Sequence, residues 1–410
     1  MAGQPLHVLI AGAGIGGLCC ALALQRRGFR VTVLEQARAL SEVGAGFQVS
    51  ANGSRCLADI GLGDEVSRLA TRADGKQVRL WHTGQTWKLF DLGAESVQKY
   101  GFPYYLVYRA DLHALMARRV REREPGAIRL GAKAIGFTQD AEGVEVELEG
   151  GDRVRGDILI GADGVHSRIR RAMFGQTDAQ FTGCMAWRGL VPRDKLPKHL
   201  HANLATNWIG PGAHVIHYPL RDGKLVNFVG IVERSDWQVE SWTERGSVEE
   251  CLSDFGHWHD DVHRLIRGID QPFKWALLSR QPMDNWTAGR VTLLGDACHS
   301  TLPFLAQGAV MALEDGVVLA RCLAAHRDDL AAALLRYQAL RMERTARIVR
   351  GSAANAARFH NPLLADPAQA SVYVEREWNE ESVRQRYEWL FSYDATAVDV
   401  HGASLAPAGN

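Results

Sequence analysis

Residues 6–36 read LHVLIAGAGIGGLCCALALQRRGFRVTVLEQ: an apolar strand-like run, a cluster of glycines, a helix-like apolar run and a second strand-like run. A glycine costs about 1 kcal/mol relative to alanine in a helix interior, so the cluster needs a compensating reason. Gly12, Gly14 and Gly17 have the spacing G-x-G-x-x-G. In that pattern the first glycine makes a tight turn, the second lets a pyrophosphate approach the backbone, and the third lets helix and strand pack closely. The segment therefore predicts a βαβ unit that binds a dinucleotide at a helix N-terminus.

One acid completes this pattern. Glu35 ends the second strand-like run, and a carboxylate at that place accepts hydrogen bonds from a ribose 2′-hydroxyl, which favours an unphosphorylated ribose. We expect Ile15, Gly16 and Gln36, which neighbour the pattern, to contact the same ligand. A glycine-rich turn also arises from packing alone, so a purely structural turn is the alternative.

The totals of the chain exclude several classes of protein. Its 410 residues exceed one compact core and indicate two domains. Lys plus Arg and Asp plus Glu number 47 each, so no overall field attracts nucleic acid or an anionic membrane. The seven cysteines are scattered without a C-x-x-C pair, which is typical of reduced thiols in a cytosolic protein. The first apolar run breaks at glycines before it could span a membrane. We therefore expect a cytoplasmic monomer or homodimer that binds no metal.

Two later segments place carboxylates where a ligand is expected. A glycine-containing loop is expected at 44–48, and after it the chain lacks the regular βαβ repeats of a dehydrogenase. Two later segments, residues 157–168 (DILIGADGVHSR) and 290–299 (RVTLLGDACH), are short apolar strands that end in Gly/Asp turns. Open α/β sheets bind ligands at the carboxyl ends of their strands. Asp163 and Asp296 are therefore candidates for ligand contacts, although Asp in such turns is also a simple turn former.

Taken together, these segments resemble the group A flavoprotein aromatic hydroxylases, the family of para-hydroxybenzoate, salicylate and 3-hydroxybenzoate hydroxylases. The resemblance covers nearly the whole chain. The glycine turn and Glu35 match the family's first FAD fingerprint. Arg109, in Tyr-Arg-Ala-Asp-Leu, matches the arginine that the family places near the flavin, with a surface helix-start residue as the alternative.

The two later turns match further motifs of the family. The pair Asp163 and Gly164 matches its Asp-Gly motif, which is implicated in binding FAD and the pyridine nucleotide. The pair Gly295 and Asp296 matches its Gly-Asp motif, whose aspartate contacts the ribityl chain. The resemblance implies an α/β fold with a Rossmann-like FAD-binding domain, an inserted antiparallel-sheet substrate domain as in para-hydroxybenzoate hydroxylase, and C-terminal helices.

The domain boundaries follow from the motifs and from period-two patterning between residues 181 and 272. The expected parts are a discontinuous FAD-binding domain at 1–75, 100–180 and 275–350, a substrate-binding sheet at 76–99 and 181–274, and a helical tail at 351–410.

The resemblance also implies a reaction. In the family, NADH or NADPH reduces non-covalent FAD, molecular oxygen adds to flavin C4a, and the resulting hydroperoxide hydroxylates an activated aromatic ring. A monocyclic phenolic acid such as salicylate or a hydroxybenzoate is the expected substrate. Two alternatives stay open: a hydroxylase or epoxidase of the same fold acting on a heteroaromatic or other non-benzoate substrate, and a flavin-binding sensor without turnover.

A proline loop is expected beside the flavin ring. Residues 308–325 read as a helix that begins just after Pro303-Phe-Leu-Ala-Gln-Gly308. Its N-terminal amides and partial positive charge would face the pyrimidine edge, where reduced flavin is anionic. Pro303 fits the family's proline beside the isoalloxazine, and Gln307, Gly308 and Ala309 would give backbone contacts. An ordinary loop before a core helix is the alternative.

A phenol with a pKa near 10 is only ~0.1% ionised at pH 7, although the phenolate reacts better. A base or acceptor is therefore expected among His214, His217 and Tyr218. On a strand, His214 and Tyr218 share one face and His217 lies on the other, so only one set can contact the substrate. A structural role for any one histidine is the alternative, and His299 is expected to belong to the Gly-Asp turn.

Further side chains suggest the character of the pocket. Phe47, Trp187 and Phe304 indicate apolar walls. Arg79 or Arg188 is a candidate partner for a substrate carboxylate, although a solvated surface position is the favoured interpretation for each.

Overall fold

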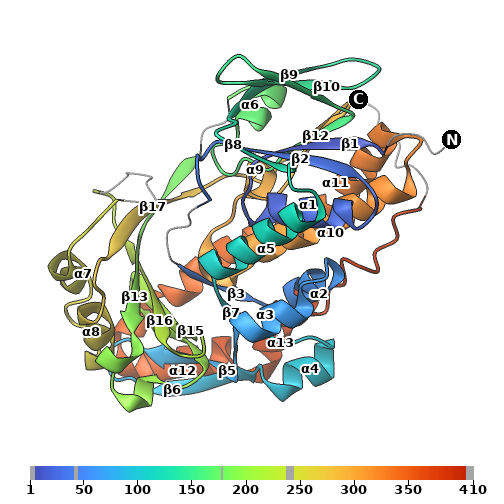
Figure 1. Cartoon of the computed structure of the whole chain (residues 1–410). Helices are drawn as coiled ribbons and strands as arrows, with labels where there is room; N and C mark the ends of the chain where they lie inside the picture. Colours follow the sequence, from blue (N-terminus) through green and yellow to red (C-terminus); the bar gives the residue numbers. More distant parts are fainter. Residues whose placement is uncertain (1–4, 41–44, 177–178, 237–243, 403–410) are drawn as a thin grey trace.

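A computed structural model describes residues 5–40, 45–176, 179–236 and 244–402 (Figure 1). Residue 44 of the expected glycine loop and the last eight residues of the expected tail lie outside this part of the chain. Residues 46–49 are a strand, β3 (Gly46–Val49), which corrects the expectation of a loop there. β3 pairs with β7 (Tyr105–Tyr108), which also pairs with β4 (Thr71–Arg72), in a small antiparallel sheet.

A six-stranded sheet holds the first glycine turn. Its strands, in spatial order, are β18 (Thr287–Ala288), β19 (Val291–Leu293), β12 (Ile158–Gly161), β1 (His7–Ala11), β2 (Arg30–Glu35) and β8 (Ile128–Leu130). All pairs from β19 to β8 are parallel, and the central strands β19, β12, β1 and β2 are largely buried and apolar, whereas the edge strand β8 is mostly exposed.

Helices and a small sheet cover the two faces of this sheet. On one face lie α1 (Ile15–Gln25), α5 (Arg109–Arg123) and α10 (Gly308–Ala325), as Figure 1 shows. On the other lie α6 (Arg168–Phe174) and an antiparallel sheet of β9 (Ala134–Gln139), β10 (Val144–Leu148) and β11 (Arg153–Gly156). The helix expected at 308–325 is confirmed with the same bounds.

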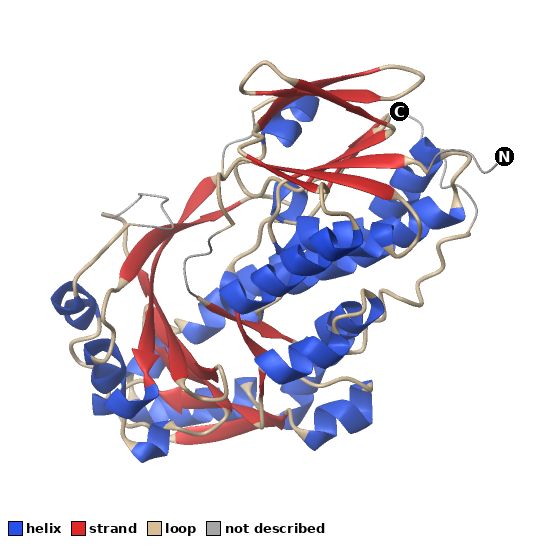
Figure 2. Ribbon diagram, in the orientation of Figure 1, coloured by secondary structure: helices blue, strands red, loops and turns tan. Residues whose placement is uncertain are grey.

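A seven-stranded sheet forms the second layer (Figure 2). Its strands, in spatial order, are β17 (Phe273–Ser279), β13 (Gln180–Pro192), β16 (Leu225–Glu233), β15 (Ala213–Leu220), β14 (Leu204–Gly210), β5 (Gly75–Leu80) and β6 (Thr86–Asp91). Neighbours are antiparallel except β14 and β5, which are parallel.

Period-two alternation gives this sheet two distinct faces. The inner face, which includes Val78, Ile209 and Tyr218, packs against Phe304 and the C-terminal helices. The outer face, which includes Trp208, packs against α7 (Val248–Asp254) and α8 (Asp260–Arg267). Which face a residue occupies therefore decides whether it can approach the Pro303 loop.

The C-terminal helices pack against the inner face of the large sheet. α11 (Leu330–Phe359) packs along α10, and α12 (Pro367–Glu377) and α13 (Glu380–Phe391) close the inner face. The ring of Phe90 on β6, for example, meets Tyr387 of α13 edge-on at 5.4 Å. No helix in the described ranges has both the length and the apolarity needed to cross a membrane.

A buried charge cluster joins α10 to its surroundings. Glu314 and Asp315 on α10 are fully buried, and Arg341 of α11, also fully buried, lies 2.7 Å from each. Arg344 contacts Glu314 at 2.8 Å and His299 contacts Asp315 at 2.6 Å. Burial alone would raise the pKa of Asp315, but His299 and Arg341 hold it below its ordinary value. Such a cluster is stable only while every charge keeps its partner.

Replacing Arg341 by methionine removes the cation shared by both carboxylates. We expect Arg341→Met to lower the free energy of unfolding by about 3–5 kcal/mol, because a broken buried pair leaves uncompensated charge. Urea denaturation followed by circular dichroism measures this. Arg350→Met, an exposed arginine on the same helix, should change stability by less than about 0.5 kcal/mol. Equal effects of the two substitutions would contradict the assigned role.

Candidate active site

Three turns meet at one edge of the six-stranded sheet. Gly12 follows β1, Gly164 follows β12 and Gly295 follows β19, and these strands are neighbours. Gly12 has φ +107°, and a Cβ there would lie 2.4 Å from the carbonyl oxygen of Ala162. The first two turns are therefore in direct contact, and only glycine fits at their junction.

The remaining glycines of the first turn divide into two roles. A Cβ at Gly17 would lie 2.1 Å from the carbonyl oxygen of Gly12, and one at Gly16 would lie 2.8 Å from Leu294 Cδ2. Both positions therefore serve close packing. A Cβ at Gly14 would meet no atom within 4 Å. The backbone at Gly14 faces open space, as the approach of a pyrophosphate requires.

Glu35 is tied to the same turn. Its Oε2 accepts a hydrogen bond of 2.8 Å from the Ala13 amide, and its Oε1 accepts one of 2.8 Å from the Ala37 amide. His113 of α5 reaches the carbonyl oxygen of Ala13 at 2.7 Å. Glu35 is half-buried and the following Gln36 is exposed. The strand end, the turn and α5 therefore hold one another in place beside the open space at Gly14.

Asp163 serves the start of α6. Its carboxylate accepts hydrogen bonds from the Ser167 hydroxyl at 2.5 Å, the Arg168 amide at 2.7 Å and the Ile169 amide at 3.1 Å. These bonds satisfy amides at the helix N-terminus. Asp163 therefore has the structural role that the sequence analysis gave as the alternative to a ligand contact. Gly164, where a Cβ would meet no atom within 4 Å, is the member of the pair that leaves room for a ligand.

Asp296 lies in the third turn, and its negative charge interacts with the positive charge of Arg109. The Asp296 side chain is exposed, yet surrounding protein raises its pKa against the lowering effect of the His299 and Arg109 cations. The Asp296 carboxylate is therefore accessible although protein atoms surround it. Arg109 begins α5, and its amide donates to the Ala45 carbonyl oxygen at 2.9 Å.

The Pro303 loop leads into α10. Pro303 is exposed, whereas Phe304 is buried. Gln307 is buried, and its side chain meets Ser50 Oγ at 3.0 Å and Asn52 Nδ2 at 3.1 Å. The first helical bond runs from the Met311 amide to the Gln307 carbonyl at 2.7 Å.

Polar backbone groups are also available at the start of α10. The amides of Gly308 and Ala309 precede the first helical bond, and both residues are half-buried. The open backbone at Gly14, the exposed carboxylate of Asp296 and the helix start at Gly308 are what an extended dinucleotide needs along its length. The residues present therefore fit FAD.

The inner face of the large sheet carries two of the three predicted acid–base candidates, and one of them, His214, lies beside this loop. His214 and Tyr218 share that face, as expected for a strand. The His214 ring lies 5.1 Å from the ring of Phe304. Burial, with His360 and Lys76 nearby, lowers the pKa of His214 far below its ordinary value, and burial raises the pKa of Tyr218.

The third candidate lies elsewhere. His217 is on the outer face, where burial and the charge of Arg79 lower its pKa to about 3. Arg79 itself pairs with Asp261 at 3.1 Å on that face. The structure therefore separates His217 and Arg79 from the Pro303 loop, and we exclude both from the candidate site.

Two other expectations need correction. Trp187 is on the outer face, where its Nε1 donates to Asp254 at 2.7 Å, so it is no wall of the pocket. Phe304 lies on the inner side, and Phe47 is half-buried on β3. Arg188, expected at a solvated surface, is only 5% exposed and lies near the ring of Trp275, an inner-face residue.

One residue of this face was missed by sequence reasoning. Lys76 is 4% exposed, and burial lowers its pKa to about 8. The sequence did indicate that Lys76 is buried. Lys76, Val78 and Leu80 alternate along β5 and so lie on one face of the strand, and Val78 and Leu80 are core residues. A lysine in the apolar phase of a strand indicates a buried charge.

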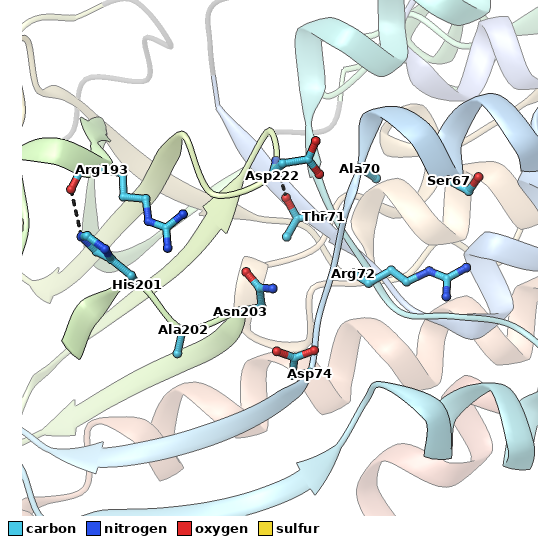
Figure 3. A pocket seen from close by; sticks show the side chains of 10 residues that line it. All are labelled: Ser67, Ala70, Thr71, Arg72, Asp74, Arg193, His201, Ala202, Asn203 and Asp222. Carbon is cyan, nitrogen blue, oxygen red and sulfur yellow. Dashed lines mark hydrogen bonds between the residues drawn. The ribbon is translucent and has the colours of Figure 1, made fainter. Parts of the chain in front are cut away.

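A separate cleft of about 580 Å³ opens beside β4 and the start of β14 (Figure 3). Its charged lining is of both signs, with Arg72 and Arg193 near Asp74 and Asp222. It includes none of the residues that the sequence predicts for FAD or substrate. We assign it no part in the candidate site.

Comparisons with known proteins agree with this geometry. A family model described as "FAD binding domain" matches residues 5–352. The chain is 35% identical over 392 residues to 3-amino-4-hydroxybenzoate 2-monooxygenase PtnB3 of Streptomyces platensis, with 96% of this chain and 97% of that protein covered. It is 36% identical over 390 residues to 3-hydroxybenzoate 6-hydroxylase of Polaromonas naphthalenivorans (strain CJ2), with 95% and 96% covered.

Among solved structures, Klebsiella pneumoniae HpxO complexed with FAD and uric acid matches with a TM-score of 0.80 and 28% identity, covering 92% of this chain and 96% of that one. The predicted fold class and the predicted FAD cofactor are confirmed.

The glycine roles can be tested with a matched pair of variants. Gly14→Ala should fold within about 1 kcal/mol of the wild type, because its Cβ meets open space. It should nevertheless weaken FAD binding about tenfold or more, because the methyl group occupies the pyrophosphate's approach. Gly17→Ala should instead lose about 3 kcal/mol or more of stability through its clash with Gly12.

Urea denaturation of the apoprotein and FAD titration by flavin fluorescence separate the two effects. Unchanged FAD affinity in Gly14→Ala would contradict the placement of the pyrophosphate.

Proposed function

We propose, from the premise that the chain belongs to the FAD-binding-domain family, that it is an NAD(P)H-dependent monooxygenase that hydroxylates a monocyclic phenolic acid. Relatives that match over 95% or more of the chain are monooxygenases of 3-amino-4-hydroxybenzoate and 3-hydroxybenzoate. Both names describe a ring with a carboxylate and a phenol. The site must therefore be able to receive a negative charge and to accept a phenolic proton.

Buried cations on the inner face carry the assignment of an acidic substrate. Lys76 and Arg188 are 4% and 5% exposed. In the described part of the chain no carboxylate forms a salt bridge with Lys76, whose ammonium lies 5.7 Å from the centre of the Tyr387 ring. Burial disfavours an ammonium that lacks a counter-charge. The low pKa of Lys76, about 8, reflects that cost. A substrate carboxylate would supply the missing negative charge at pH 7, where most Lys76 side chains still carry a proton.

The turns after β1, β12 and β19, together with the Pro303 loop, would hold the cofactor. FAD, when bound and reduced by NAD(P)H, supplies activated oxygen to the aromatic ring. The residues proposed to contact it are Gly12, Gly14, Ile15, Gly16, Gly17, Glu35, Gln36, Arg109, Gly164, Gly295, Asp296, Pro303, Gln307, Gly308 and Ala309. Asp163 would act through α6, whose N-terminus it caps. The amides at the start of α10 would stabilise negative charge on the reduced ring.

The substrate would lie between the inner face and the Pro303 loop. Nε2 of His214, a buried atom with no hydrogen-bond partner, would accept the phenolic proton, and Tyr218 on the same strand face would orient the ring. Phe304, 2% exposed, would help to exclude water from the reacting atoms. Pro303, exposed beside it, would support the flavin ring.

Steady-state turnover tests this function. The purified holoenzyme should be yellow and should oxidise NADH or NADPH faster with salicylate or 3-hydroxybenzoate than without an arene. Mass spectrometry should find a product heavier by one oxygen atom, or the decarboxylated hydroxylation product. Stimulation by uric acid alone would favour a heteroaromatic substrate. A yellow protein that no arene stimulates would favour the flavin-binding sensor.

The role of Lys76 has its own test. Lys76→Met should weaken 3-hydroxybenzoate binding about 10- to 100-fold through loss of a charged partner. Binding of phenol, which lacks the carboxylate, should change less than about twofold. Flavin absorbance titration of the holoenzyme measures both affinities. Lys88→Met, an exposed lysine on β6, is the control. Equal weakening of both ligands by Lys76→Met would contradict carboxylate recognition.

A further inference from the structure

A line of three polar side chains connects the inner face to the surface. Nδ1 of His214 lies 2.7 Å from Nε2 of His360, and Nδ1 of His360 lies 2.9 Å from Oε1 of Glu233. His214 and His360 are buried, whereas the Glu233 side chain is 57% exposed. The line therefore begins beside Phe304, where the His214 ring lies, and ends in solvent.

The chemistry of the end group fixes the direction of these bonds. A carboxylate can only accept, so His360 must donate its Nδ1–H to Glu233. A neutral imidazole carries one proton, which leaves Nε2 of His360 as an acceptor. Nδ1 of His214 must then donate to it, and Nε2 of His214 is left with a bare lone pair. That atom is buried and has no hydrogen-bond partner.

The surroundings of His214 disfavour a proton that stays there. The ring contacts Phe304 and Phe359, each about 5 Å away between ring centres. Burial, together with the positive groups Lys76 on β5 and His360, keeps the pKa of His214 far below its ordinary value. The carboxylate of Glu233 is the only negative group bonded to the pair among the described residues. A proton taken from a substrate must therefore move on toward Glu233.

We propose that His360 and Glu233 are positioning residues that carry the substrate's phenolic proton from His214 to solvent. The inference rests on the proposed function, since it needs a phenolic substrate. The phenol O–H bond breaks as Nε2 of His214 gains the proton. The Nδ1 proton of His214 passes to Nε2 of His360, the Nδ1 proton of His360 passes to the Glu233 carboxylate, and water takes it from there. The reverse transfer, when product leaves, restores both rings.

The fold holds this line in position. His360 follows the last residue of α11, and its amide donates to the Ala356 carbonyl at 3.0 Å. Its own carbonyl accepts a 3.1 Å bond from the Gly212 amide, in the turn between β14 and β15. The Glu233 amide donates to the Gly212 carbonyl at 2.9 Å. One turn thus anchors both partners of the relay.

The first test needs no substrate. Nitrogen-15 NMR of histidine side chains in the ligand-free holoenzyme should find both rings neutral at pH 7, each with its proton on Nδ1. Glu233→Gln should remove this fixed direction, because an amide donates as well as accepts. A proton on Nε2 of His214 in the wild type would overturn the relay.

The second test follows proton release by stopped flow with a pH indicator at pH 7. The wild-type holoenzyme should release about one proton per bound 3-hydroxybenzoate, and none with 3-methoxybenzoate, whose oxygen carries no proton. His360→Asn keeps a group that accepts from His214 but cannot relay. This variant should bind the methyl ether as the wild type does, but should release the proton roughly 100-fold more slowly.

Controls separate this inference from the proposed function. Glu375→Gln, an exposed glutamate on α12, should leave proton release unchanged, and formate should partly restore release in Glu233→Ala. Wild-type release rates in His360→Asn would overturn the relay. If the wild type shows the expected tautomers but binds neither benzoate, the bonded line stands and the proposed substrate class is wrong.

Discussion

Glu314 and Asp315 lie side by side and fully buried on α10, and adjacent carboxylates can be buried only when cations from other elements meet them. Those cations come from α11 and from the turn after β19. The Gly295 amide also donates to Asp315 at 3.1 Å, and the Asn52 side chain donates to Glu314 at 2.7 Å. The position of α10 relative to α11 and to the turn after β19 therefore depends on one electrostatic centre.

This centre explains how one helix can serve both layers. The start of α10 follows the Pro303 loop, and its middle is fixed by the charge cluster. α11 then runs from the cluster to His360, which meets the large sheet at the turn around Gly212. A single pair of packed helices thus connects the Pro303 loop to the large sheet.

Local patterns were predictable from the sequence, and long-range partners were not. The glycine spacing, the bounds of α10 and the shared face of His214 and Tyr218 depend on a few neighbouring residues, so the pattern alone determines them. The burial of Arg188 and the position of Trp187 depend on which face of a strand meets a helix layer. Contacts such as His214 with His360 join residues 146 apart, and no period in the sequence reports them. The hydrogen bonds that Asp163 accepts from the start of α6 are local. An Asp-Gly pair in a sequence is nevertheless compatible both with a helix cap and with a ligand contact, so the pattern alone does not decide between them.

The parallel pairing of β5 with β14 has a consequence for biosynthesis. Gln77 on β5 and Thr206 on β14 are hydrogen-bonded although 129 residues separate them. During translation β5 and β6 leave the ribosome well before the strand that completes their sheet, so an unpaired edge waits while that stretch is made. High contact order of this kind slows folding. The nascent chain is therefore most exposed to misassembly at this edge, before the interior of the substrate layer has closed.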